Sequence, residues 1–492
     1  MLRVAWRSLL TRPVRAAVLA AGFGFGIAVM AVLLGVGEVI VEQARAPVLA
    51  GGGDLVLTGP FGPVTSARYV LSVLDAPDIR SRLAAASATR RERLFLITSG
   101  RAIPVSATGG VPSREKAVGD PEAAWPAWQD GPEDAAWVHP DAGAVLRAMD
   151  RFHAVPEGRP EDDSWAEWLY FNGRTPDGRT RVYVTFLVGA PPDGAAARGA
   201  PAAPATRPAG VRLQLEHDGR ATAYSAAGLV DAASVLASAP DLDIAGNRVR
   251  LEGSTYVIAL NVAAEGPARQ GGSSQSGSAR ARRLTGTLRL AAAEGRSVPP
   301  ATVRGAGGWV TGYTVPVLAG RMDGVLEADG TTVRFDGAPG YHDHNWGFWK
   351  GVSWQWGQVA HEDLSIVYGR VFPPSDVADP RRMPGFLVVL GPEGLLGFSS
   401  EVAIDDRREG RIEVRARRGV DLQMTLVVDE TVRTAMALTA RRGEAPMDFL
   451  QLGGTYRVAG RTGGRALEFS ARGSAETFKR RPASSPGAAA RR

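Results

Sequence analysis

Cysteine is absent from this chain of 492 residues. Its absence excludes thiol catalysis, disulfide bonds and metal sites with cysteine ligands, but it does not assign a compartment. Lysine is also scarce and occurs only at Lys116, Lys350 and Lys479, so arginine supplies nearly all of the 57 basic residues. These arginines are spread along the chain instead of forming one run. We therefore expect a solvated surface and no nucleic-acid partner.

A long apolar run without charge occurs once, at residues 16–37. As a helix, these 22 residues would cover the roughly 30 Å hydrocarbon core of a bilayer. Arginines precede the run and glutamates follow it, so the positive-inside rule makes residues 1–15 a cytoplasmic basic stub. A cleaved signal peptide would have a shorter apolar core of about 7–15 residues. The sequence predicts a single-pass protein of the inner (cytoplasmic) membrane, with the bulk of the chain extracytoplasmic or periplasmic.

The remainder of the chain changes its pattern along its length. Residues 38–145 mix short apolar strands with a helical patch, which predicts a small mixed α/β segment and a linker. From residue 165 onward, period-two alternation and frequent turn signals predict many short antiparallel strands, a pattern that favours barrels or sandwiches. Two low-complexity stretches, 190–210 and 266–283, are predicted surface loops, and residues 479–492 a basic disordered tail.

The segment WAEWLYF at residues 165–171 is the first that combines a carboxylate with aromatic groups. On a strand, Glu167 shares one face with apolar residues, whereas Trp168, Tyr170 and Asn172 share the other. In one interpretation these four residues bind a ligand. In the other, the segment is a barrel-rim strand with Glu167 in solvent.

A second segment, GYHDHNWGFWK at residues 340–350, combines imidazole, carboxylate and indole groups. Together with His361, this segment holds three of the six histidines of the chain. Together with residues 351–356, it holds four of the eleven tryptophans. Because side chains alternate along a strand, the carboxylate faces one side and the two imidazoles face the other. The first face carries Tyr341, Asp343 and Asn345, the second carries His342, His344 and Trp346, and Trp349, Trp354 and Trp356 follow.

Three interpretations of this second segment stay open. In the first, apolar surroundings keep Asp343 partly protonated, so that it donates a proton to a C=C bond or a polar substrate group, and the indoles stabilise a developing carbocation. In the second, His342, His344 and His361 bind a metal, because His-x-His on one strand sets two ligands side by side. In the third, the segment is a hydrogen-bonded polar knot between two β domains. We expect no metal and no cofactor.

Both segments carry motifs of a known superfamily. WAEWLYFNGRTPDGR resembles the signature E-W-W-Y-F-x-G…DGR, and GYHDHNWG followed by WQWG resembles Y-H-D-x-N-x-G…W-x-W. Both signatures belong to the lipocalin-like superfamily of carotenoid 1,2-hydratase (hydroxyneurosporene synthase), the AttH-type proteins and related terpenoid and polyketide cyclases. The resemblance implies a mainly β chain with two consecutive lipocalin-like antiparallel β-barrels, at residues 146–349 and 350–478. It also implies that Asp343 protonates an isoprenoid double bond, with Tyr341 and His342 as its catalytic neighbours.

The resemblance does not extend to the substrate, since Leu169 stands where the first signature has tryptophan. The ligand cavity is expected between or within the barrels. The residues expected to bind the ligand are Glu167, Trp168, Tyr170, Asn172, His344, Asn345, Trp346, Trp349, Trp354 and Trp356.

Roughly residues 1–120 resemble the start of ABC permeases of the lipoprotein-release and macrolide-export type, on stretches such as GGGDLVLTG. The later membrane helices of that family are absent, so this chain by itself is not a permease. AttH-type proteins are associated with such permeases. Together the resemblances imply a membrane-anchored extracytoplasmic protein that binds a lipophilic, isoprenoid-like small molecule and hydrates or cyclises it by proton transfer from Asp343. The alternative is a non-catalytic lipophile-binding accessory subunit of an ABC exporter, with the permease and ATPase subunits as partners.

Overall fold

The computed structural model describes most of the chain from residue 77 onward and short segments before it. The described ranges are 14, 55–57, 67–74, 77–98, 101–120, 123, 125–134, 141–156, 164–189, 206–265, 282–293, 296–392, 394–436 and 447–480. The predicted membrane helix at 16–37 lies outside them, as does the predicted stub at 1–15 apart from Val14. None of the helices within these ranges has the length and apolar character needed to span a bilayer.

The chain forms two compact units, of which the smaller comprises Met1–Thr58 and Leu74–His139. Its described part is a small mixed α/β segment, as the sequence predicts. An antiparallel hairpin forms its sheet, and the buried Glu115 accepts hydrogen bonds from the hydroxyls of Ser87 and Thr89, both at 2.7 Å. Its elements are α4 (Pro77–Arg80), β1 (Arg90–Thr98), β2 (Arg101–Gly109), α5 (Pro112–Ala117) and η2 (Pro132–Asp134).

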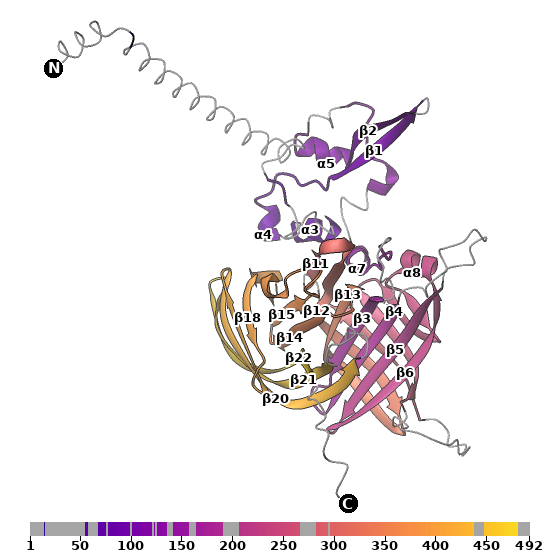
Figure 1. Ribbon diagram of the computed structural model, residues 1–492, viewed down its shortest axis with the longest axis vertical. Helices are drawn as coiled ribbons and strands as arrows, with labels where there is room; N and C mark the ends of the chain where they lie inside the picture. Colours follow the sequence, from indigo (N-terminus) through magenta and orange to yellow (C-terminus); the bar gives the residue numbers. More distant parts are fainter. Residues whose placement is uncertain are drawn as a thin grey trace, which may run out of the picture. The chain divides into compact units, whose positions relative to one another are not determined.

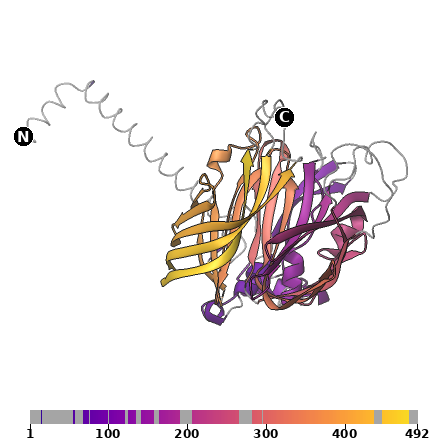
Figure 2. The same ribbon diagram turned by 90° about the horizontal axis from the view of Figure 1, so that it is seen from below.

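The larger unit comprises Gly59–Val73 and Pro140–Arg492 and contains two antiparallel sheets that stand side by side (Figures 1 and 2). The first sheet closes into a barrel, because β9 pairs with β6 at one end and with β10 along its length. Its strands are β3 (Trp165–Arg174), β4 (Thr180–Gly189), β5 (Thr206–His217), β6 (Arg220–Asp231), β7 (Leu242–Ile244), β8 (Asn247–Glu252), β9 (Thr255–Ala264), β10 (Arg283–Ala292), β11 (Val298–Arg304), β12 (Val310–Ala328) and β13 (Thr331–Phe348).

The second sheet is a nearly closed barrel of nine strands. Its end strands, β17 and β18, follow each other in the chain, and side-chain bonds such as that from the Thr462 hydroxyl to the Leu396 carbonyl (3.2 Å) cross near this seam. Its strands are β14 (Ser353–His361), β15 (Leu364–Phe372), β16 (Phe386–Gly391), β17 (Gly394–Ser399), β18 (Glu401–Asp405), β19 (Arg411–Arg417), β20 (Val420–Met436), β21 (Met447–Thr462) and β22 (Arg465–Arg480). The prediction of two consecutive antiparallel barrels is therefore confirmed.

Few helices accompany the barrels in the described residues. The N-terminal end of α7 is capped by Asp141, whose carboxylate accepts from the Ala144 N–H at 2.9 Å, and α3 is tied to the first barrel by the Tyr69 hydroxyl, which donates to the Ser297 carbonyl at 2.9 Å. The helices are α3 (Ala67–Leu74), α7 (Ala142–Met149), α8 (Ala232–Ser238), η4 (Ala306–Gly308) and η5 (Pro380–Arg382).

The strands form because apolar residues alternate with polar ones, so that one face of each sheet is buried. In β8, for example, residues 247, 249 and 251 are buried while residues 248, 250 and 252 are exposed. The inward side chains fill two separate apolar cores, one in each barrel. Further apolar clusters, which include Val315 and Leu318 from the first barrel and Val367 and Val388 from the second, pack the outer faces of the barrels together. The barrels therefore share a buried interface.

Strand residues extend into segments predicted as loop or tail. β5 begins at Thr206, inside the predicted loop at 190–210. At its start Arg207 is buried, and its Nε–H donates to the Gly189 carbonyl at 2.7 Å. β22 continues beyond residue 478, since the Lys479 ammonium lies 3.3 Å from the Asp406 carboxylate.

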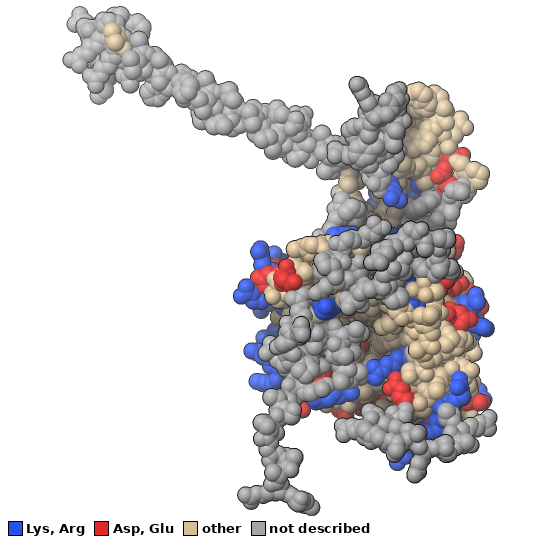
Figure 3. Space-filling model, turned by 45° about the vertical axis from the view of Figure 1, so that its right-hand side comes forward, with Lys and Arg blue, Asp and Glu red and all other residues tan. Residues whose placement is uncertain are grey.

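Charged side chains of both signs are mixed over the face drawn in Figure 3. Exposed arginines pair with nearby carboxylates, as in Arg179–Asp218 (2.7 Å) and Arg248–Asp243 (2.7 Å). On this face the arginines behave as a solvated, paired surface.

Candidate functional site

The candidate site is built around β13, which lies between β12 and β3 in the first barrel. In the register of β13 and β3, His342 is opposite Phe171, Asp343 opposite Tyr170 and His344 opposite Leu169. Side chains alternate as expected for a strand. The two imidazoles point into the first barrel, whereas Asp343 points toward the second.

Inside the first barrel, His344 bridges two carboxylates. Its Nδ1–H donates to Asp150 Oδ1 at 2.8 Å and its Nε2–H donates to Glu167 Oε1 at 2.9 Å. All three side chains have no exposed surface. The interpretation that leaves Glu167 in solvent is therefore wrong, because β3 is an interior strand and Glu167 faces the barrel core.

The hydrogen-bonded chain continues at both ends. At one end, the Tyr256 hydroxyl donates to Asp150 Oδ2 at 3.0 Å, and His342 Nε2 lies 2.9 Å from the same oxygen. At the other end, His153 Nδ1 lies 2.7 Å from Glu167 Oε1, and its ring stacks on Trp346 with centroids 4.2 Å apart. The hydrogen-bonded network therefore runs from the partly exposed His153 into the core of the first barrel.

Charge pairing sets the pKa values of the side chains in this hydrogen-bonded network. Burial alone would raise the pKa of Asp150, but the charge and hydrogen bonds of His342 and His344 outweigh it and lower the pKa to about 2. Burial would likewise raise the pKa of Glu167, and hydrogen bonds from His153 and His344 lower it. For His344, burial lowers the pKa, and the two carboxylates raise it to about 9. The bridge is therefore an imidazolium between two carboxylates at neutral pH.

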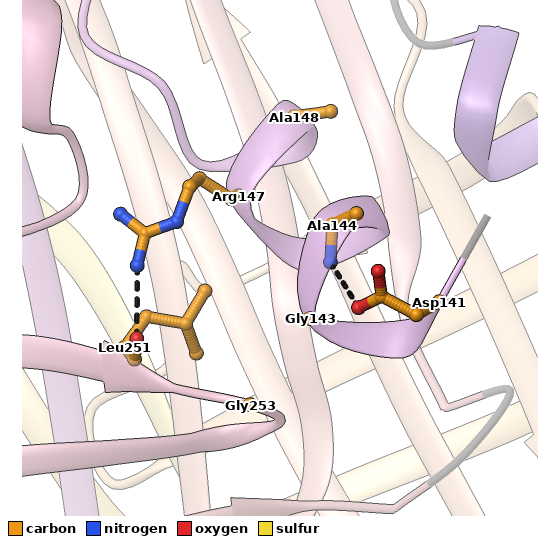
Figure 4. Close-up of a pocket in the computed structure, with 7 residues that line it drawn as sticks. All are labelled: Asp141, Gly143, Ala144, Arg147, Ala148, Leu251 and Gly253. Atoms are coloured by element: carbon orange, nitrogen blue, oxygen red, sulfur yellow. Dashed lines mark hydrogen bonds between the residues drawn. The ribbon is translucent and has the colours of Figure 1, made fainter. Parts of the chain in front are cut away.

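Helix α7 positions Asp150, its C-terminal cap residue, in this hydrogen-bonded network. The helix is fixed to the barrel by Arg147, which donates to the Leu251 carbonyl at 2.8 Å (Figure 4) and also pairs with Asp241 at 3.3 Å. Arg147 and Leu251 also line a surface hollow of about 440 Å³, together with Gly143 and Gly253. This hollow and a second of about 360 Å³ at residues 418–421 and 461–464 contain none of the predicted site residues.

On its other face, β13 presents Asp343 to the second barrel. Asp343 is 4% exposed, and its two carboxyl oxygens accept hydrogen bonds from the Tyr341 hydroxyl and the Asn345 amide, both at 2.8 Å. The Tyr341 hydroxyl lies 2.9 Å from that of Tyr313, which accepts from the Trp356 indole N–H at 2.9 Å. Trp356 belongs to β14, so this bonded chain crosses from one barrel to the other.

A second carboxyl group, that of Glu476 on β22, lies beside Asp343. Its Oε2 accepts from the Trp354 indole N–H at 2.9 Å. Burial raises the pKa of Glu476 to about 7, against the hydrogen bonds from Trp354 and Gln451. Burial and the charge of Glu476 together raise the pKa of Asp343 well above its ordinary value.

Aromatic rings from both barrels surround these two carboxyls. Trp168 lies against Trp349 (centroids 4.5 Å apart) and Trp354 (6.1 Å), and Trp354 packs edge-on against Phe478 at 4.6 Å. On the other side, Tyr170 lies 6.3 Å from Trp356. The two carboxyls therefore lie among π faces supplied by both barrels.

The predicted site residues therefore divide into two groups. At the interface between the barrels are Trp168, Tyr170, Asn172, Tyr341, Asp343, Asn345, Trp349, Trp354 and Trp356, and facing the core of the first barrel are Glu167, His342, His344 and Trp346. The Trp346 ring lies so close to Gly312 on β12 that a Cβ there would come within 2.0 Å of it. The second group is enclosed by protein and supports β13 from behind.

The structure does not bring His361 to His342 and His344. His361 lies at the end of β14 and stacks on Phe469, with centroids 4.5 Å apart. The three-histidine metal site is therefore wrong, because β14 carries His361 into the second barrel.

Another set, His153, Glu167 and His344, is the group in the described residues that could hold a metal, with ligand atoms within 4.8 Å of one another. Its contacts of 2.7 and 2.9 Å are hydrogen-bond distances. Two ligands of one tetrahedral zinc ion would lie about 3.3 Å apart, so the arrangement fits shared protons better.

Asp150, His153, Tyr256, Tyr313 and Glu476 belong to the two clusters and were missed by sequence reasoning. Asp150 and His153 follow a short amphipathic stretch and carry no motif of their own. Glu476 lies more than a hundred residues beyond Asp343, in a segment whose similarity to the superfamily is loose. Glu476 carries no motif of its own, so the sequence offered no signal that would have found it.

The fold and these clusters define a mainly β protein of two antiparallel barrels with a carboxyl-containing site between them. No family model matches the chain, and no curated protein does. Among solved structures it is similar to kievitone hydratase from Nectria haematococca, with 13% identity, a TM-score of 0.38 and coverage of 68% of this chain and 94% of that one. It is also similar to CghA, with 12% identity, a TM-score of 0.38 and coverage of 68% of this chain and 96% of that one. For CghA with Sch210972 the identity is 12%, the TM-score is 0.37, and the coverage is 67% of this chain and 94% of that one. At this level of similarity, the fold assignment rests on the strand pairing of the chain itself.

Replacing His344 by alanine should lower the free energy of unfolding by about 3–5 kcal/mol at pH 7, because two buried carboxylates lose their shared cation. His361→Ala, which removes a partly exposed ring, should cost about 1 kcal/mol or less. The pKa of His344 is raised in the fold, so its stabilisation is complete below pH 6.5 and is lost as the pH rises through about 9. Urea unfolding from pH 6 to 10 measures both effects. An equal loss in the two variants would contradict the bridge.

Proposed function

We propose that this chain binds a lipophilic, isoprenoid-like molecule between its two barrels and hydrates or cyclises it by proton transfer from Asp343. The observation that carries the proposal is the state of Asp343. Its carboxyl is buried among aromatic rings beside a second carboxyl, and both influences raise its pKa and so favour the protonated form. A protonated carboxyl in an apolar, π-rich site can deliver a proton to a C=C bond.

The neighbours of Asp343 have distinct roles in this proposal. Tyr341 and Asn345 hydrogen-bond its two oxygens and so fix the plane of the carboxyl group. The indoles of Trp354 and Trp356 offer π faces to a cationic intermediate. His342 stacks on Phe171 behind the strand, at 4.1 Å between centroids, and holds β13 in place without facing the ligand.

Ligand entry requires a local separation of the barrels. The carboxyls and their aromatic neighbours are packed together, and the two surface hollows lie elsewhere. Because the residues around Asp343 come from both barrels, a small displacement along their interface would open a site lined by both. Closure around the ligand would then keep bulk solvent away from the carbocation and limit the water that reaches it.

The location of this activity is also part of the proposal. The predicted helix at 16–37 anchors the chain in the inner membrane, with both barrels on the extracytoplasmic side, where a lipophilic molecule can be received from the bilayer. The resemblance of roughly residues 1–120 to ABC permeases supports a permease and its ATPase as partners.

The anchor predicts that the full chain stays in the membrane pellet after an alkaline carbonate wash, whereas a chain lacking residues 1–40 is released. A reporter fused after residue 480 should be active outside the cytoplasm. Reporter activity in the cytoplasm would overturn the proposed topology.

Asp343→Asn should retain the bound lipophile and lose about 10²–10⁴-fold in turnover, because the isosteric amide cannot donate the same proton. Lipid extraction and mass spectrometry of the purified full chain would identify the bound molecule and its product. Asp336→Asn, at an exposed position of the same strand, is the matched control and should leave both unchanged. Unchanged turnover in Asp343→Asn would contradict the role of Asp343. A wild type that binds and exports the lipid without any turnover would favour the non-catalytic exporter subunit.

A further inference from the structure

We propose that Glu476 of the second barrel is the general base of this site and takes the proton from the water molecule that adds to the ligand. The inference rests on the proposed function, since it assigns the second half of the same hydration. Both barrels then contribute to the site, because the acid comes from β13 of the first barrel and the base from β22 of the second.

The geometry that carries this proposal is centred on β14. Trp354 and Trp356 are two residues apart on this strand, so their indoles lie on the same face. One indole N–H holds the Glu476 carboxylate at 2.9 Å, and the other holds the Tyr313 hydroxyl at 2.9 Å. From Tyr313 the bonded chain continues through Tyr341 to Asp343. One strand therefore positions both carboxyls.

The two carboxyls differ in their burial and hydrogen bonding, as a proton donor and a proton acceptor require. Asp343 lies in the interface cluster, and hydrogen bonds from Tyr341 and Asn345 orient it. Glu476 is only partly buried and lies at the β14–β22 junction, where its strand pairs with Trp356. Because two neighbouring carboxylates disfavour each other, the site rests with one group protonated and one ionised. Burial is deeper at Asp343, so the proton stays there.

The proposed step balances as follows. The Asp343 O–H bond breaks, and its proton forms a C–H bond with one carbon of the double bond, leaving a carbocation on the other carbon. A water oxygen donates a lone pair to that carbon and forms the C–O bond. The resulting oxonium ion loses a proton to the Glu476 carboxylate. The product is an alcohol, and a proton passes from Glu476 back to Asp343 to restore the site.

Several other ionisable groups face this pair and could shape its pH dependence. Tyr170, Tyr313 and Tyr341 surround Asp343, and burial raises the pKa of each well above 10, so they stay neutral. The His344 cation lies behind β13 and lowers the pKa of Asp343 slightly against the larger effects of burial and Glu476. Glu476 therefore governs the rising limb of a pH–rate profile, near pH 7.

The test follows two isotopes in the full chain, with the co-purified lipid and with squalene as an isoprenoid alkene. Deuterium from D₂O reports protonation of the double bond, and ¹⁸O from H₂¹⁸O reports addition of water. The wild type should incorporate both, and Asp343→Asn neither. Glu476→Gln should keep deuterium exchange and lose ¹⁸O incorporation by about 10²–10⁴-fold. Glu468→Gln, at an exposed position of the same strand, should match the wild type.

A second variant separates the base from a merely structural role. Trp354→Phe keeps an aromatic ring but removes the N–H that holds the Glu476 carboxylate. Since this bond lowers the pKa of Glu476, the rising limb for ¹⁸O incorporation should move to higher pH, while the pH dependence of deuterium incorporation, which depends on protonated Asp343, stays unchanged.

The outcomes are distinguishable. Wild-type ¹⁸O incorporation in Glu476→Gln, an equal loss of both isotopes in it, or an unmoved pH profile in Trp354→Phe would overturn the role of Glu476 and leave the proposed function standing. A wild type that incorporates neither isotope would overturn the hydration itself, and this inference with it.

Discussion

The hydrogen bonds from His344 to Asp150 and Glu167 are the interaction on which the rest of the site depends. They join three separate elements, α7, β3 and β13, at a point without solvent exposure. Charges in such a place must be paired, and removing one partner leaves an uncompensated buried charge. The bridge therefore fixes the rotation and register of β13 relative to the helix and the neighbouring strand. The position of Asp343, the next residue along, follows from it.

One strand separates two opposite electrostatic environments. On the inner face of β13, a cation between carboxylates lowers the pKa of Asp150 and Glu167. On the outer face, burial and the neighbouring Glu476 carboxyl raise the pKa of Asp343. Both arise from strand alternation, which sends consecutive residues to opposite sides of the sheet. The inner face supplies rigidity, and the outer face supplies a proton.

Local patterns predicted much of this structure, and non-local pairing limited the rest. Period-two alternation predicted many short antiparallel strands and the opposite directions of His344 and Asp343, and the resemblance to the lipocalin-like superfamily predicted the two barrels. It could not predict that β9 closes the first barrel onto β10, because the pairing of distant strands depends on the whole sheet. For the same reason Asp150 and Glu476 were missed, since each reaches β13 from a distant part of the chain. Density of histidine suggested a metal site that included His361, but strand β14 carries that residue away.

The central claim is that Asp343 is protonated at neutral pH because the two barrels bury it together. Infrared spectroscopy of the carboxyl C=O stretch at pH 7 tests this most directly, as a difference between the wild type and Asp343→Asn in H₂O and D₂O. We expect the wild type to show a protonated-carboxyl band that shifts in D₂O and is missing in the variant. A difference spectrum that contains only the loss of ionised carboxylate bands would contradict the claim.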